Sequence, residues 1–450
     1  MPLNAKEIDL ILAQSGNPEL ARSQWEGFQA PVDFSAQPGS AAFLSLFGNS
    51  RPFMNWIARR PDLIQPLLSS SILFQKKPLL ELTAEWHTFL TSSQGNDDFK
   101  QTLRHFRHRE MMRLMIRELA QLGDYESIGQ EIANLAQVTQ EAALSHALAQ
   151  TKKIHGTPQL ARQHLECGFS VVGLGKLGGE DLNFSSDIDV LFLYDSDSGQ
   201  CPSGASLHEF ANQLFQLSMD LLQKRTEDGF VFRVDTDLRP EGKSGTLSNS
   251  LDAVEDYYEN WGANWERAAL LKARPVAGTR HTALDFLKRV FPFVYRQTLD
   301  TSVLTELKEM KNKINQDQKK RLKQTFNVKL GEGGIREIEF FVAIFQLLYG
   351  GKQPALRPTQ TLRALQALGE RGIITLEDAA HLRTAYIFLR RIENRLQILD
   401  DQQTHQLPAE PKELLALARR MNCPSVDEFQ DQLQQTRKIV SDHFQHLNLT

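Results

Sequence analysis

The chain has 450 residues, of which 51 are Lys or Arg and 55 are Asp or Glu, so its formal net charge at pH 7 is −4. At roughly 150 residues per domain, this length predicts two or three domains. The charge balance argues against a nucleic-acid-binding protein, and three widely spaced cysteines, Cys167, Cys201 and Cys423, argue against a disulfide framework or a zinc site. Neither a signal peptide nor a run of about 18 apolar residues occurs, so we expect no membrane partner and a cytoplasmic location.

Residues 1–156 have the composition and periodicity of helices, which predicts an N-terminal helical domain. Ile128 and Ile132, for example, lie one turn apart on a stripe that we expect to be buried. The most charged piece, residues 104–113, places Arg109 and Arg113 on one helix face. We interpret this face as solvated, with the apolar side chains turned inward; the alternative is that it meets an acidic surface.

A glycine-rich turn followed by two carboxylates marks the second predicted domain, residues 157–300. The turn covers residues 173–179 and follows an apolar strand. Asp187 and Asp189 come next on an extended segment, and because alternate residues of a strand point to one face, we expect their carboxylates to lie together. Carboxylate oxygens are the ligands that magnesium prefers.

Further along this domain the sequence predicts a helix and then another strand. Ser206 and Glu209 have the spacing of a capping box, which begins a helix that we expect to reach about residue 225. The alternating residues 230–235 follow a turn and predict a strand that ends in Asp235. A third carboxylate thereby joins the predicted site.

The chemistry of this predicted site is phosphoryl or nucleotidyl transfer. Asp187, Asp189 and Asp235 are suited to two magnesium ions about 4 Å apart, which clamp the attacking and leaving oxygens at phosphorus. The residue order of a P-loop is missing. We expect the ammonium of Lys176, the hydroxyl of Ser186 and the backbone amides of Gly178 and Gly179 to contact phosphate. Charge on the transferring group would be neutralised by four basic side chains, which are Arg239, Lys243, Lys272 and Arg274.

Residues 301–450 predict a C-terminal helical bundle. Its clearest expected helices cover residues 304–311, 335–349 and 376–399. The glycine-aspartate block occurs once, so the predicted catalytic unit is not repeated.

In these residues the chain resembles the glutamine synthetase adenylyltransferase family of the DNA polymerase beta-like nucleotidyltransferase superfamily. The resemblance implies a mainly helical α+β fold, in which a nucleotidyltransferase mixed-sheet core is flanked by N- and C-terminal helical domains. It covers nearly the whole chain. The matching blocks are residues 104–110, 173–190, 228–240, 255–258, 264–274, 291–296, 333–340 and 388–394.

Members of the family carry two homologous halves that attach and remove AMP on a tyrosine of glutamine synthetase. The block at residues 182–189 looks like that of the N-terminal half, the adenylyl removase. The resemblance therefore implies phosphorolysis, in which inorganic phosphate releases the nucleotide ADP from AMP-modified glutamine synthetase. It also implies that Asp187, Asp189 and Asp235 hold the metal, and that a PII signal protein controls the enzyme.

Two other functions stay open at this point. The first is the forward reaction, in which AMP passes from ATP to the tyrosine. The second is a regulatory module without catalysis that binds glutamine synthetase or a PII protein, although intact carboxylates count against it. The chain also departs from the family pattern, because Asp237 stands where a basic residue is common. Either a phosphate contact is lost there, or the assignment of Asp235 as third carboxylate is contested.

Overall fold

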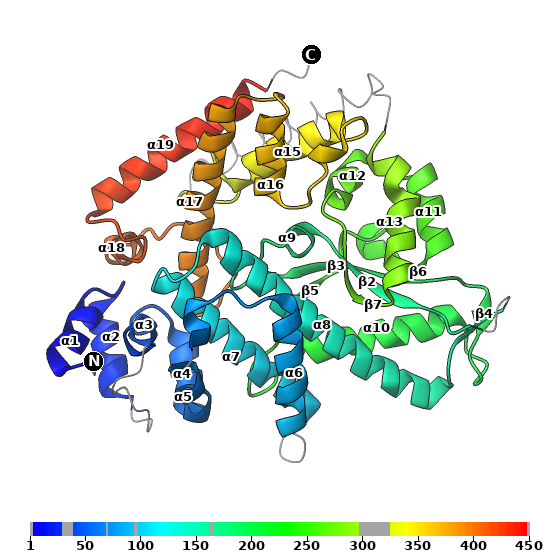
Figure 1. Cartoon of the computed structure of the whole chain (residues 1–450), viewed down its shortest axis with the longest axis horizontal. Coiled ribbons are helices and arrows are strands. Elements are labelled where there is room, and N and C mark those ends of the chain that lie inside the picture. Colours follow the sequence, from blue (N-terminus) through cyan, green and yellow to red (C-terminus); the bar gives the residue numbers. More distant parts are fainter. Residues whose placement is uncertain are drawn as a thin grey trace.

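The structure is a computed structural model that describes residues 3–28, 39–68, 71–93, 98–161, 165–296 and 325–447. Helices surround one small mixed sheet (Figure 1), which confirms the predicted α+β class. Among the described residues, no helix is both long enough and apolar enough to cross a membrane. The predicted helix at residues 304–311 lies outside the described residues.

Helices form the N-terminal part of the chain, as predicted, and α7 and α8 are the longest of them. The side chain of Asp124 accepts a hydrogen bond from the backbone amide of Ser127 and caps the start of α8. The helices are α1 (Ala5–Ala13), α2 (Pro18–Glu26), α3 (Ser40–Leu44), α4 (Arg51–Arg59), α5 (Gln65–Leu68), α6 (Leu79–Ser93), α7 (Phe99–Leu119) and α8 (Tyr125–His155). Short 3-10 helices cover Pro61–Leu63 and Ser71–Phe74, and two more follow later at Gly242–Ser244 and Pro354–Leu356.

The charged face of α7 is buried, so the prediction of a solvated face is wrong. Arg113 donates from Nε to Glu110 at 2.9 Å and from an NH2 group to Glu131 at 2.6 Å. Arg104 is also buried, and its Nε donates to the carbonyl of Gly229 at 2.9 Å. The arginines stay inside because neighbouring elements cover them and provide acceptors, which the sequence pattern of α7 alone does not reveal.

A mixed sheet lies at the centre of the molecule, in the order β5-β3-β2-β7, with β6 also paired to β3. β2 runs antiparallel to β3 and β7, whereas β5 and β6 run parallel to β3. The expected strand at residues 230–235 is reduced to its last two residues, because the amides of Val231 and Phe232 donate to the carbonyl of Leu222 and only Val234 and Asp235 pair with β3. The strands are β2 (Phe169–Gly173), β3 (Ile188–Tyr194), β5 (Val234–Asp235), β6 (Ser248–Ser250) and β7 (Arg274–Gly278), and a separate pair joins β1 (Gln159–Leu160) to β4 (Gly199–Gln200).

Both faces of the sheet are covered by helices. Successive residues of a strand point to opposite faces, so Val171 packs into one apolar core with α8 and α10, and Val172 packs into a second core with α11 and α13 (Figure 1). The capping box of Ser206 and Glu209 begins α10, as predicted. The helices of this part are α9 (Gly175–Gly178), α10 (Leu207–Gln223), α11 (Leu251–Asn260), α12 (Asn264–Leu270) and α13 (Arg280–Val294).

The C-terminal helices pack against the second core and extend it. α15 and α17 confirm the helices predicted at residues 335–349 and 376–399. α17 also contacts α4 and α8, so it reaches from the C-terminal helices to the N-terminal ones (Figure 1). The helices are α15 (Ile335–Tyr349), α16 (Thr361–Glu370), α17 (Leu376–Asp400), α18 (Pro411–Arg420) and α19 (Val426–Gln445).

Candidate active site

The glycine-rich turn lies directly against the carboxylate of Asp189. The chain leaves β2 at Gly173, and the amide of Leu174 donates to the carbonyl of Asp189 at 2.9 Å. Gly175 has a φ of 49°, and a Cβ atom added there would lie 2.2 Å from Oδ2 of Asp189. Both the left-handed backbone and the close approach require glycine. The turn is thereby fixed beside β3, the strand that carries Asp189.

Asp189 and Asp235 face each other on neighbouring parallel strands. The register of β3 and β5 places Ile188 opposite Val234 and Asp189 opposite Asp235. Residues that are paired in register on adjacent strands project to the same face of a sheet. The structure therefore brings together two of the three predicted metal-binding carboxylates.

Asp187, beside that pair, is bound by an arginine. Its Oδ1 accepts a hydrogen bond from Nε of Arg233, and Arg233 also donates to the carbonyl of Ser185 at 2.5 Å. Within the described part of the chain, no group of three or more His, Cys, Asp or Glu residues is arranged to hold a metal ion. Magnesium commonly uses only one or two protein carboxylates and completes its shell with water and phosphate oxygens. The donors of Asp189 and Asp235 fit that requirement, and the participation of Asp187 as a third metal ligand stays a prediction.

The electrostatic environment of Asp189 is unfavourable to its negative charge. Burial raises the pKa of Asp189 to about 6, and the charge of Asp235 adds to this rise. Lys176 and Lys329 act in the opposite direction but do not outweigh it. A buried carboxylate beside a second carboxylate is the usual setting of a cation site or a catalytic acid or base.

The predicted phosphate ligands near the turn are already engaged. The ammonium of Lys176 donates to Asn183 Oδ1 at 2.8 Å and lies 3.4 Å from Glu393 Oε1, and burial lowers its pKa to about 8. The amides of Gly178 and Gly179 donate to the carbonyls of Leu174 and Gly175 at 2.8 and 3.0 Å. The expectation that these two amides contact phosphate is therefore corrected, because the turn coils into α9 and uses them internally. Ser186 is buried in the segment before β3, and its amide donates to the Asn183 carbonyl at 3.4 Å.

The four predicted neutralising side chains divide into two groups. Arg239 donates to backbone carbonyls of its own loop, including Gly245 at 3.0 Å, and Lys243 is 82% exposed and pairs with Asp237 at 3.2 Å. Arg274 donates hydrogen bonds to Gln137 Oε1 at 2.7 Å and to the carbonyl of Leu177 at 3.1 Å, so it connects α8 to the turn. Arg239 and Arg274 therefore support the structure around the site, whereas Lys243 lies at the surface.

Lys272, the fourth predicted neutralising side chain, lies between the turn and the C-terminal helices. Its ammonium donates to Thr361 Oγ1 at 3.2 Å and lies 3.6 Å from Glu339 Oε1. Its carbonyl oxygen would lie 1.9 Å from a Cβ atom added at Gly178. Lys272 is therefore beside the turn, with its charge directed towards α15 and α16.

Two residues of α17 that are not among the predicted site residues bind the segment between the turn and β3. Asn183 Nδ2 donates to Asn394 Oδ1 at 2.7 Å, and the amide of Ser185 donates to Gln397 Oε1 at 3.0 Å. The block at residues 388–394 was the only signal in the sequence, and it carried no indication of where it packs. Contact across more than 200 positions of sequence is a property of the tertiary fold.

A buried cluster around Asp181 connects all three parts of the chain. Both carboxylate oxygens of Asp181 accept hydrogen bonds from tyrosines, one from Tyr125 of α8 and one from Tyr386 of α17. Arg390 donates to the Tyr125 hydroxyl and to the Asp181 carbonyl, each at 2.6 Å. The polypeptide after the glycine-rich turn is thus fixed by the N-terminal and C-terminal helices together.

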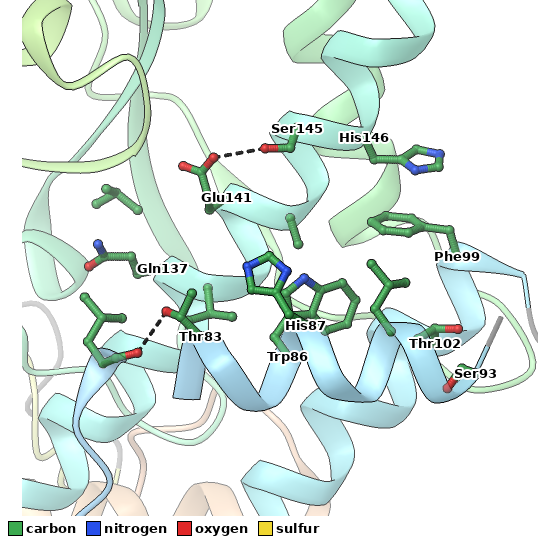
Figure 2. A pocket seen from close by; sticks show the side chains of 15 residues that line it. Thr83, Trp86, His87, Ser93, Phe99, Thr102, Gln137, Glu141, Ser145 and His146 are labelled. Carbon is green, nitrogen blue, oxygen red and sulfur yellow. Dashed lines mark hydrogen bonds between the residues drawn. The ribbon is translucent and has the colours of Figure 1, made fainter. Parts of the chain in front are cut away.

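A cavity of about 680 Å³ lies elsewhere, between α6, α7 and α8. Figure 2 shows side chains of α6 and α8 facing each other across it, with Glu141 hydrogen-bonded to Ser145 at 3.0 Å. None of the predicted site residues lines this cavity. The carboxylates and the turn, not the large cavity, therefore define the candidate site.

Comparison with known proteins gives two family matches. A family model described as glutamate-ammonia ligase adenylyltransferase matches residues 40–289. Another, described as GlnD PII-uridylyltransferase, matches residues 308–448. The first match contains the turn and all three predicted carboxylates, and the second contains α15 to α19.

Curated relatives of the chain are named bifunctional glutamine synthetase adenylyltransferase/adenylyl-removing enzyme. The relative from Nitrosococcus oceani is 37% identical over 448 residues, which are 99% of this chain and 46% of the relative. The relative from Hahella chejuensis is 37% identical over 86% of this chain and 40% of its own length. The relative from Haemophilus ducreyi is 40% identical over 72% of this chain and 34% of its own length. The chain therefore spans less than half the length of these relatives.

Proposed function

The chain belongs to the glutamate-ammonia ligase adenylyltransferase family, and from that membership we propose that it transfers a nucleotidyl group at a tyrosine of glutamine synthetase, in the direction that removes AMP. The observation that supports this proposal is the pairing of Asp189 with Asp235 on parallel strands beside the glycine-rich turn. Two carboxylates in register, one of them with a raised pKa, suit the binding of a magnesium ion, which would neutralise charge on phosphate.

The proposed reaction is a phosphorolysis. An oxygen of inorganic phosphate attacks the phosphorus of the AMP-tyrosine ester, and the bond from phosphorus to the tyrosine oxygen breaks. The leaving oxygen takes a proton, so the products are ADP and unmodified glutamine synthetase. Asp189 and Asp235 would hold magnesium, which when bound neutralises charge on the phosphate oxygens.

The residues around the carboxylates position the reacting groups. The turn and the Asp181 cluster fix the backbone on both sides of α9, and a fixed geometry is a large part of the rate enhancement in such a reaction. Arg233 holds Asp187 beside the pair, so Asp187 orients the end of β3 in this conformation. The further partners in this proposal are the nucleotide, inorganic phosphate and a controlling PII signal protein.

The direction of the reaction rests on the resemblance of residues 182–189 to the removing half of the family. Phosphorolysis requires a place for inorganic phosphate where an enzyme that uses ATP would place pyrophosphate. The same carboxylates serve either direction, so only an assay with both substrates separates them.

Incubation of the chain with AMP-modified glutamine synthetase, magnesium and phosphate tests the proposal. We expect ADP to form only when both phosphate and magnesium are present, and ATP not to replace phosphate. If the chain instead labels unmodified glutamine synthetase from ATP and leaves the modified protein untouched, the direction is reversed. Binding of glutamine synthetase without either reaction would identify a regulatory module.

A further inference from the structure

Lys329 lies in a short loop whose backbone is fixed by many hydrogen bonds. The loop leads into α15, and Asn327 Oδ1 accepts from the amides of Lys329 and Leu330 at 3.0 and 2.8 Å. The Lys329 carbonyl accepts from the amide of Arg336 at 3.0 Å. Gly333 completes the loop with a φ of 73°, and a Cβ atom added there would lie 2.3 Å from the carbonyl oxygen of Arg437. The position from which the Lys329 side chain extends is therefore well defined.

This loop is connected to the candidate active site. The amide of Val328 donates to the carbonyl of His405 at 2.8 Å, and the His405 ring lies 2.7 Å from Glu393. Glu393 is in turn the partner of Lys176, at 3.4 Å. Lys329 itself is half-buried. A chain of direct contacts thus places the loop next to the lysine of the glycine-rich turn.

The charge of Lys329 acts on the site from this position. Lys329 lies close enough to Asp189 for its positive charge to act on that carboxylate. Lys329 also helps to hold the pKa of Glu339 below its usual value, against the effect of burial, and its charge contributes to the lowered pKa of Lys176. The Lys329 ammonium therefore interacts electrostatically with the same group of charged residues as the carboxylate pair, a group that includes Lys176 and Lys272.

Lys329 differs from the other two lysines of this group in its partners. Lys176 is bound by Asn183 and Glu393, and Lys272 by Thr361 and Glu339. In the part of the chain that the structure describes, the Lys329 ammonium makes neither an ion pair nor a side-chain hydrogen bond. A half-buried cation without a protein partner is available to form a charge-assisted contact with a doubly charged phosphate group.

We propose that Lys329 binds the phosphate group that is not part of AMP, either as inorganic phosphate before the reaction or as the terminal phosphate of ADP after it. This inference rests on the proposed function. It moves the phosphate contact from the amides of Gly178 and Gly179, which are used within α9, to a loop that the C-terminal part of the chain contributes. This loop then belongs to the active site, and the C-terminal helices support it.

The test compares nucleotide binding by the whole chain and by Lys329→Met, with Lys352→Met as the matched control. Lys352 is exposed in the turn after α15 and lies on none of the contacts described above. Calorimetry with magnesium-ADP and with magnesium-AMP measures each affinity directly. We expect Lys329→Met to weaken ADP binding about 10- to 100-fold, as the loss of one charge-assisted contact implies, and to leave AMP binding within about twofold.

Lys329→Arg keeps the charge and is expected to retain most of the ADP affinity, which separates anion binding from a structural role. In the phosphorolysis assay, Lys329→Met is expected to raise the KM for phosphate about tenfold and leave the KM for modified glutamine synthetase unchanged. Unchanged ADP affinity, or an equal loss for ADP and AMP, would overturn the role of Lys329 and leave the proposed function standing. A wild-type chain that binds neither nucleotide would overturn the proposed function, and the role of Lys329 with it.

Discussion

Two carboxylates in this molecule, the buried Glu110 of α7 and the half-buried Asp189 of β3, have pKa values that are shifted in opposite directions. Burial opposes the charge of Glu110, but Arg113, Arg109 and Lys77 outweigh it and lower its pKa to about 2. Burial also opposes the charge of Asp189, and there the nearby carboxylates add to the effect, so its pKa rises to about 6. The difference lies in the neighbours that the fold provides.

The comparison separates a cluster that stabilises the fold from one that is prepared for chemistry. Around Glu110 each negative charge meets a positive one, as in the 3.0 Å contact from Lys77 and the 2.9 Å contact from Arg113. Around Asp189 like charges are held together, and the free energy that this costs is recovered when a cation binds. Exchange of single residues in the two clusters should therefore have different consequences.

The largest expected effect is that of Asp189→Asn on turnover. The amide keeps the shape of the side chain and removes a charge from the proposed metal site, so we expect the rate of ADP formation to fall about a thousandfold. The fold should remain intact, and the thermal midpoint in metal-free buffer at pH 8 should rise because repulsion from Asp235 is lost. Activity within a few fold of wild type would contradict the assignment of Asp189 to the active site.

Glu110→Gln should affect stability rather than chemistry. The substitution leaves Lys77 and Arg113 buried with one fewer negative partner, and we expect the free energy of unfolding to fall by about 3 kcal/mol. Urea denaturation measures this change, and Glu81→Gln at an exposed position of α6 is the control, expected within about 0.5 kcal/mol of wild type. Loss of turnover without loss of stability would show that Glu110 has a role in the reaction.

The same cluster predicts how stability depends on pH. The pKa of Glu110 falls from 4.5 to about 2 on folding, so its contribution is present above about pH 4.5 and is lost as the pH falls towards 2. The difference in unfolding free energy between wild type and Glu110→Gln should therefore shrink from pH 6 to pH 3. Denaturation curves at several pH values measure it, and a constant difference would show that Glu110 does not titrate as proposed.

The smallest expected effect is that of Asp237→Asn. Asp237 is exposed and pairs with the exposed Lys243, so its loss should change turnover by no more than about twofold. Asp235→Asn, two residues earlier, should be severe because Asp235 faces Asp189 in register. The reverse order in the turnover assay would make Asp237 the third carboxylate.

Several elements follow from local sequence alone, because their signals are contained within a few residues. The capping box of Ser206 and Glu209 begins α10, and the apolar periodicity of residues 335–349 predicts α15. The pairing of Asp189 with Asp235 agrees with the expectation that both belong to one site. The strand at residues 230–235 was overestimated, since alternation does not show how many residues find a partner strand.

Local sequence is therefore enough to predict the long helices, the glycine-rich turn and the charged residues of the site. The tertiary structure establishes which of these charges are neutralised by partners and which are not. Arg104 and Arg113 look like surface residues in the sequence but are buried among acceptors from distant segments, and Lys176 is taken by Glu393 of α17. The reason is physical: backbone conformation depends mainly on neighbouring residues, whereas the free energy of a charge depends on burial and on partners that only folding brings near.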